Sequence, residues 1–176
     1  MKFTLSWLKE HLDTTAGVDE ISETLTRIGL EVEEVVNPAA ALDGFITARI
    51  DKVDKHPDSD HLHILAVNTG KEILQVVCGA PNVHEGLVGI YAPTGALIPA
   101  YGERLKVAIR GVESMGMMCS EKELLVGDDH NGIIELPAET KAGIPAAEVL
   151  NIDPVFEVSI TPNRAECLGV RGIARD

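Results

Sequence analysis

The sequence predicts a mainly β protein with short helices (α+β), in which a small barrel interrupts a smaller α/β module. Between residues 45 and 136 about six short segments alternate apolar and polar residues, separated by turns rich in glycine, proline and asparagine. That spacing is typical of a small barrel or sandwich. The two ends carry helical spacing and an isolated strand instead. Because the first 38 residues are too few for a core of their own, we expect both ends to fold together.

Length and composition fit one medium domain, or a small barrel with a partial second unit, since the chain has 176 residues. Its 3 cysteines are far apart and odd in number, which argues against a disulfide framework and for a reducing, cytoplasmic setting. No apolar run reaches the roughly 18–20 residues of a membrane span, and no signal-peptide pattern follows Met1. We therefore expect no membrane partner.

The first part of the split module is expected over residues 1–38. Leucines at helical spacing predict a short amphipathic helix over residues 3–12. A second apolar stripe over residues 18–28 predicts a helix that ends at Gly29, where a left-handed C-cap favours glycine. The β-branched run at 30–36 predicts a strand.

The barrel is expected over residues 39–150, beginning with small residues that follow Asn37 and Pro38. Asn68-Thr69-Gly70 is a hairpin signal between two of its strands. Its predicted strands cover residues 45–53, 62–67, 72–77, 87–91, 104–110 and 133–136. Residues 151–176 then supply a strand near 155–160 and a helix that begins near Ala165, and the pattern is still running at Asp176, as in an excised fragment.

The segment from Glu103 to Ser120 is the most informative stretch. Its first half alternates, with apolar residues on one face and cations on the other: Leu105, Val107 and Ile109 against Arg104, Lys106 and Arg110. A row of cations at the rim of a small barrel is suited to nucleic acid, but three cations are also typical of a merely solvated face.

Four segments resemble one known family. The run IRGVESMGMMCSEKELLVG resembles the tRNA-binding OB-fold domain that is attached to several aminoacyl-tRNA synthetases and also occurs as free tRNA-binding proteins. DKVDKHPDSDHL, VVCGAPNV and GALIPAYG match the same family in the expected order. The resemblance implies a partly open five-stranded OB barrel, with additions, as the inserted domain.

The two ends resemble a second, more specific family. MKFTLSWLKEHL and EVSITPNRAECLGVRGIARD are similar to the opening module of bacterial phenylalanyl-tRNA synthetase β subunits, in which an OB domain splits the same module. This implies an α2β2 parent ligase with an α-subunit partner, which joins phenylalanine to tRNA using ATP and magnesium. The catalytic and editing sites of that family lie elsewhere, so we assign no catalytic residue, cofactor or metal to this part.

The candidate RNA contacts are cations, one histidine and two hydroxyl groups on the predicted barrel: Lys52, Lys55, His56, Arg104, Lys106, Arg110, Ser114 and Ser120. The only plausible stacking platforms are Tyr91 and Tyr101, so recognition of tRNA shape and backbone is favoured over base reading. DNA is not an expected partner.

Alternative interpretations accompany these assignments. His56, His61 and His63 would suit a metal cluster, but exposed polar groups of a loop are the simpler interpretation. Cys119 is expected to pack as a small apolar group, and Ser120 to cap a following helix. Residues 39–150 carry 9 basic and 16 acidic side chains, a net −7 that also fits a structural or protein-interaction module. A free tRNA-binding protein is disfavoured by the two ends.

Overall fold

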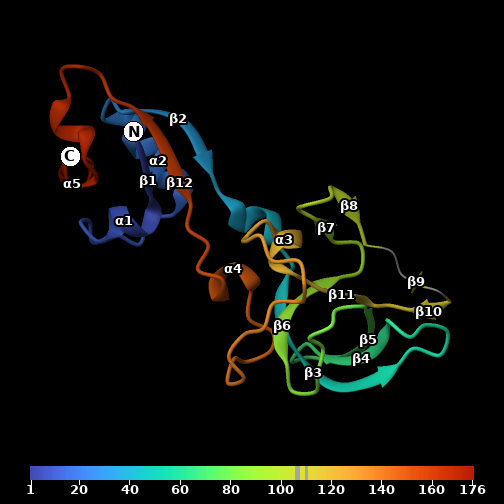
Figure 1. The fold of residues 1–176 in the computed structure, drawn as a ribbon. Helices are drawn as coiled ribbons and strands as arrows, with labels where there is room; N and C mark the ends of the chain where they lie inside the picture. The colour runs from blue at the N-terminus through green and yellow to red at the C-terminus, as the bar shows by residue number, and fades with distance from the viewer. Residues whose placement is uncertain (106–107, 110) are drawn as a thin grey trace. The chain divides into compact units, whose positions relative to one another are not determined.

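The computed structural model describes residues 1–105, 108–109 and 111–176 (Figure 1). It confirms a mainly β protein with short helices. The chain forms two compact units, Met1–Ala40 with Ile152–Asp176, and Ala41–Asn151. No helix among the described residues combines the length and the apolar character needed to cross a membrane.

The first unit is built on a three-stranded antiparallel sheet that joins the two ends of the chain. Its order is β1 (Lys2–Thr4), β12 (Val155–Ser159) and β2 (Glu31–Val36). The helix predicted over 3–12 begins later than expected, since residues 2–4 form a strand. Thr4 then caps the helix by accepting a hydrogen bond from the Trp7 N–H at 3.2 Å. The helices of this unit are α1 (Leu5–Lys9), α2 (Val18–Arg27), the 3₁₀ helix η2 (Ala165–Leu168) and α5 (Val170–Arg175).

Two stacked phenylalanines form the centre of this unit's core. Phe3 and Phe156 are paired across β1 and β12, and their ring centroids lie 5.4 Å apart. Leu8, Leu25 and Ile173 bring α1, α2 and α5 onto the same cluster. The helix predicted over 18–28 is confirmed, and Gly29, with φ of +85°, ends it.

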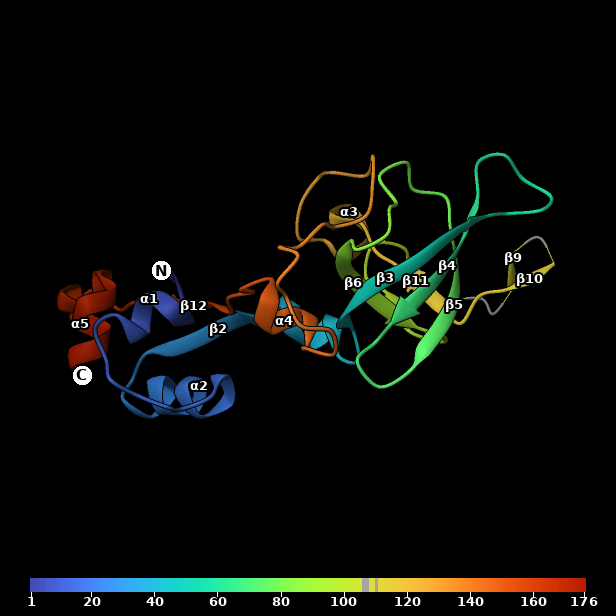
Figure 2. The same cartoon turned by 90° about the horizontal axis from the view of Figure 1, so that it is seen from below.

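The second unit contains a five-stranded antiparallel sheet curled into a nearly closed barrel of the OB type (Figure 2). The strand order is β11 (Gly116–Met118), β6 (Val88–Pro93), β3 (Ile46–Lys55), β4 (His63–Asn68) and β5 (Ile73–Cys78). Just before β11 the chain reaches the other edge strand: Met115 N–H donates to Gln75 O at 2.8 Å, and Gln75 Nε2 donates to Glu113 O at 2.9 Å. These bonds nearly close the barrel around a core that includes Ile50, Val67 and Met118.

The basic stretch does not form the single strand that its alternation predicts. Arg104 belongs to β8 (Glu103–Arg104), which pairs with β7 (Leu97–Ile98). Leu105 lies outside any strand, and a second hairpin pairs β9 (Ala108–Ile109) with β10 (Val112–Glu113). Lys106, Val107 and Arg110 lie outside the described residues. Pairing within two local hairpins therefore replaces one long strand.

Three short helices complete the described part of the chain: η1 (Pro38–Leu42), α3 (Glu121–Leu124) and α4 (Ala146–Val149). The strand predicted over 133–136 is reduced to one bridge between Val88 and Leu136. Gly116, in the motif that carried the family resemblance, has φ of +140°, and a Cβ there would lie 2.4 Å from Ala92 O. Only glycine permits β11 to approach β6 so closely.

Replacing Phe156 by alanine is expected to destabilise the first unit by about 3–5 kcal/mol, because the ring is fully buried against Phe3. Urea denaturation followed by near-ultraviolet absorbance and circular dichroism measures the change. Val36→Ala, on the neighbouring strand with its side chain 45% exposed, is the control and should cost less than about 1 kcal/mol. Equal effects of the two substitutions would contradict the central role of the phenylalanine pair.

Candidate nucleic-acid interface

Ser114 is an internal part of the barrel. Its side chain is fully buried, its hydroxyl donates to Gly116 O at 2.8 Å, and its Oγ accepts from Val77 N–H at 3.0 Å. These bonds tie the segment before β11 to β5. The sequence prediction that Ser114 contacts RNA is therefore corrected: the hydroxyl is enclosed and already bonded at both positions.

Ser120 is likewise used inside the fold. It caps α3, as the sequence predicts, in a capping box: its Oγ accepts from Glu123 N–H at 3.4 Å, while its own N–H donates to Glu123 Oε2 at 2.7 Å. Its residual exposure is 4%. A direct contact from Ser120 to RNA is therefore not available in this conformation.

His56 also differs from its predicted role. It is 4% exposed, and its Nδ1 accepts from Asp58 N–H at 3.1 Å, which shapes the loop between β3 and β4. Its Nε2 is buried without a hydrogen-bond partner among the described residues. His56 thus supports the loop from within. It does not converge with His61 and His63, because the one group of three potential ligands found in the described chain lies in the other unit.

Lys52 and Lys55 are the predicted RNA contacts that the structure places on the surface. Both are exposed on β3. Lys52 Nζ lies 2.7 Å from Asp54 Oδ2, and the hydrogen bond raises the pKa of Lys52. Such an exposed pair is weak and can be exchanged for a phosphate. Lys55 has no acidic partner in the described part of the chain, so its ammonium group is available.

The structure does not describe Arg104, Lys106 and Arg110, the cations predicted on one strand, as a common surface. The backbone of Arg104 pairs with Leu97 in the β7–β8 hairpin. Lys106 and Arg110 fall outside the residues that the structure describes. Their assignment as RNA contacts stays a prediction.

Sequence reasoning missed a pocket of about 340 Å³ beside β11. Met117, Met118 and Ile133 contribute apolar surface, and Glu123 and His130 bring polar groups to it. The exposed Asp128 and Asp129 precede His130 in the same loop. Negative charge in and next to the lining opposes a phosphate, so the pocket is better suited to a neutral or cationic group. The Met117-Met118 pair was the only signal in the sequence.

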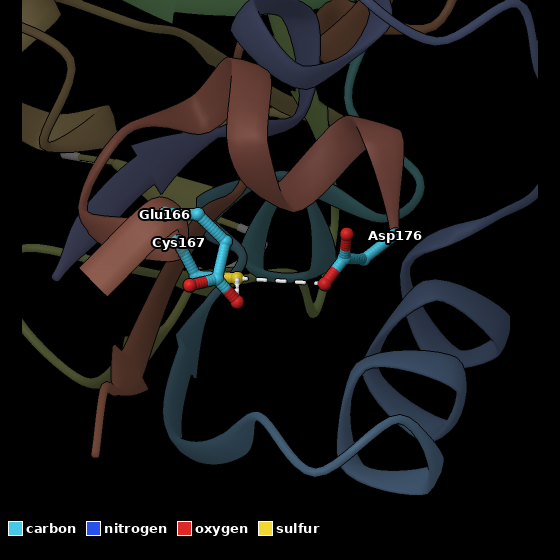
Figure 3. Close-up of side chains that lie close together, drawn as sticks. All are labelled: Glu166, Cys167 and Asp176. Atoms are coloured by element: carbon cyan, nitrogen blue, oxygen red, sulfur yellow. Dashed lines mark hydrogen bonds between the residues drawn. The ribbon is translucent and has the colours of Figure 1, made fainter. Parts of the chain in front are cut away.

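Glu166, Cys167 and Asp176 are the group in the described chain whose ligand atoms lie within 4.8 Å of one another (Figure 3). Arg164 already occupies their centre: its Nε lies 2.7 Å from Glu166 Oε1, its Nη2 lies 3.3 Å from Cys167 Sγ, and Nη2 also binds Asp176. The guanidinium supplies the positive charge that a cation would bring, so these residues do not fit a metal site.

The ion cluster has clear electrostatic effects. The hydrogen bond from Arg164 lowers the pKa of Glu166, while burial raises the pKa of the Cys167 thiol. Arg164 Nη1 also donates to Ile28 O at 3.0 Å, at the end of α2. The cluster therefore connects α2, η2 and the end of α5, and its role is structural. Cys78, Cys119 and Cys167 are all buried free thiols, and burial raises the pKa of Cys119 strongly.

A nearly closed, five-stranded antiparallel barrel with exposed lysines on its first strand has the architecture of the OB class of oligonucleotide-binding proteins. Residues 45–145 match the family described as "Putative tRNA binding domain". The chain belongs to this tRNA-binding domain family.

Curated relatives match the whole chain, including both ends. It is 55% identical over 177 residues to the phenylalanine–tRNA ligase beta subunit of Rhodospirillum rubrum, covering 100% of this chain and 22% of that protein. The corresponding subunit of Zymomonas mobilis is 58% identical over 179 residues, covering 100% and 23%. The chain thus spans less than a quarter of the length of these relatives. Among solved structures, a MetRS related protein from Pyrococcus horikoshii is 23% identical with a TM-score of 0.41, covering 57% of this chain and 85% of that one.

Ser114→Ala is expected to destabilise the barrel by about 1–3 kcal/mol, because Val77 N–H and Gly116 O lose their buried partner. The affinity of the folded variant for tRNA should stay unchanged. Thermal unfolding and fluorescence anisotropy with labelled tRNA measure the two quantities, and Ser59→Ala in the β3–β4 loop is the control. Loss of affinity without loss of stability would restore Ser114 as an RNA contact.

Glu166→Gln tests the ion cluster through pH. The folded-state pKa of Glu166 lies below the ordinary 4.5, so its stabilising effect is present above about pH 4.5 and disappears as the pH falls through the folded value. The variant should therefore unfold at lower urea than the wild type at pH 7, and the difference should close as the pH falls through the lowered pKa of Glu166. Glu33→Gln, an exposed carboxylate on β2, should show no such pattern. A difference that persists unchanged at low pH would contradict the ion pairing.

Proposed function

We propose that this chain is the tRNA-binding N-terminal region of a phenylalanine–tRNA ligase β subunit. The observation that carries the proposal is the 55–58% identity that extends over the whole chain. That similarity includes the first unit, which lies outside the residues 45–145 matched by the tRNA-binding family. A free tRNA-binding barrel would account for the second unit alone.

The parent activity that we propose is the attachment of phenylalanine to its tRNA in the cytoplasm, with ATP and magnesium, by an assembly that includes an α subunit. This chain's part is binding and positioning. We propose no residue of it for ATP, magnesium or a chemical step. The cluster around Arg164 supports this division, because the arginine takes the place where a cation would bind.

RNA binding by the barrel depends on a few local cations, because the net charge of the barrel is negative and repels phosphates. Residues 39–150 carry 9 basic and 16 acidic groups, so distant phosphates are repelled and binding requires close contact. Lys55 is free to make such a contact, and Lys52 is held only by an exposed ion pair. Phosphate contacts release counterions, so the affinity should fall steeply with salt.

Base stacking contributes little in this proposal. Tyr91 is 3% exposed and its hydroxyl binds Met115 O, which removes one of the two predicted platforms. Tyr101 is 53% exposed and is the remaining one. Recognition through the shape and backbone of tRNA is therefore favoured over reading of single bases.

A protein-interaction module is the second candidate function. Glu123 in the lining of the pocket beside β11, and the exposed Asp128 and Asp129 just before its His130, favour a neutral or cationic partner over RNA. In that case the barrel would contribute to assembly, and the fragment would bind tRNA weakly or not at all.

Binding of tRNA across a salt series separates the two functions. Arg104→Ala/Lys106→Ala/Arg110→Ala is compared with a control that also removes three cations, Lys71→Ala/Lys122→Ala/Lys141→Ala. Under the proposal the first variant loses most of its affinity, and its logarithmic salt slope falls by about 1 for each phosphate contact removed, while the control changes little. Absence of binding by the folded wild type at low salt would favour the interaction module.

A further inference from the structure

We propose that the first unit carries a second RNA contact, a phosphate-binding cavity between α1 and α5 formed by His11, Arg171 and Arg175. This inference rests on the proposed function, because it takes the ligand to be the backbone of the same tRNA. All the RNA contacts predicted from the sequence lie in the barrel, whereas this cavity lies in the first unit.

The cavity is open, has a volume of about 630 Å³ and is lined by His11, Glu166, Arg171, Gly172 and Arg175. Arg171 and Arg175 stand four residues apart on α5, and such a spacing places both side chains on one face of the helix. His11 follows α1, which packs against α5 in the same unit (Figure 1). Two guanidinium groups and an imidazole thus border one hollow.

Close packing of the backbone fixes this geometry. A Cβ at Gly172 would lie 1.8 Å from Glu166 O, so only glycine lets α5 rest on η2. The chain is also held at both sides of the cavity, because Arg164 binds Glu166 next to one wall and Asp176 at the end of α5. Arg171 and Arg175 therefore lie on a helix, α5, whose position is fixed by its packing on η2.

The charges that face the cavity are mainly positive. The exposed Arg171 has no acidic partner among the described residues, whereas Arg175 is paired with the neighbouring Asp176, its Nε lying 3.4 Å from Oδ1. The carboxylate of Glu166, the acidic residue in the lining, is neutralised by Arg164 at 2.7 Å. Two like charges four residues apart on a helix repel each other, and an anion between them relieves that repulsion.

Six acidic side chains of this unit lie on other elements, while Glu10 and Asp13 flank His11 in the chain and Asp176 follows α5. Asp19, Glu20 and Glu23 belong to α2, and Glu31, Glu33 and Glu34 belong to β2. Within this negatively charged unit, the hollow is lined by two arginines and a single carboxylate, which Arg164 already pairs. Arginine presents a planar fork of donors that matches two phosphate oxygens, so a phosphodiester is the ligand that the hollow fits.

The test compares Arg171→Gln/Arg175→Gln with Lys2→Gln/Arg27→Gln, which removes two exposed cations elsewhere in the same unit. Far-ultraviolet circular dichroism and urea unfolding first establish that both variants are folded. Binding of labelled tRNA is then measured across a salt series. The cavity variant should bind roughly tenfold more weakly at low salt, with a logarithmic salt slope lower by about 2, and the control should match the wild type.

A titration with inorganic phosphate, followed by nuclear magnetic resonance of the His11 ring and the arginine Nε–H groups, is independent of tRNA binding. Saturable shifts that disappear in the cavity variant support the site. If wild type binds tRNA and the cavity variant binds it equally well, the RNA contact is overturned while the proposed function stands. If wild type binds no tRNA, the proposed function fails, and absence of phosphate-induced shifts then overturns the site as well.

Discussion

The structure depends above all on the pairing of β12 with both β1 and β2, because this one strand joins the two ends of the chain into a single sheet. Phe156 lies at its centre, paired with Phe3 on one side and Val35 on the other. Such pairing spans most of the sequence, so closing it by a flexible chain would cost considerable entropy. The intervening barrel reduces that cost, since it is itself compact and leaves only short connections to be ordered.

The barrel has a similar dependence on a few internal contacts. Ser114 and Gly116 bring the last strand to its neighbours, one through hydrogen bonds to β5 and the other through a backbone approach to β6 that excludes any side chain. The most recognisable motif of the family is therefore largely a closure device. Its value for RNA binding is indirect, because it closes the barrel on whose strand β3 Lys52 and Lys55 are exposed.

Local sequence signals predict the structure correctly wherever residues close in the chain determine it. Gly29 ends α2, Ser120 caps α3, and Thr69 and Gly70 turn the β4–β5 hairpin, because each depends on residues close in the chain. Periodicity failed where the deciding partner is distant. Lys2–Thr4 becomes a strand through β12, and the hydroxyl of Ser114 points inward because Val77 lies across the barrel. The cationic cavity of α5 was equally hidden, since His11 and Arg171 meet only after the two ends have folded together.

The segments that enter and leave the barrel are bonded to each other. Thr47 N–H donates to Ile144 O at 2.8 Å, Gly143 N–H donates to Thr47 O at 2.8 Å, and Ala146 N–H donates to Phe45 O at 2.9 Å. A domain whose two ends are adjacent can be inserted into a loop of another domain. It can be acquired or discarded in one recombination event, with a short turn left in its place, and the sheet of the host need not change.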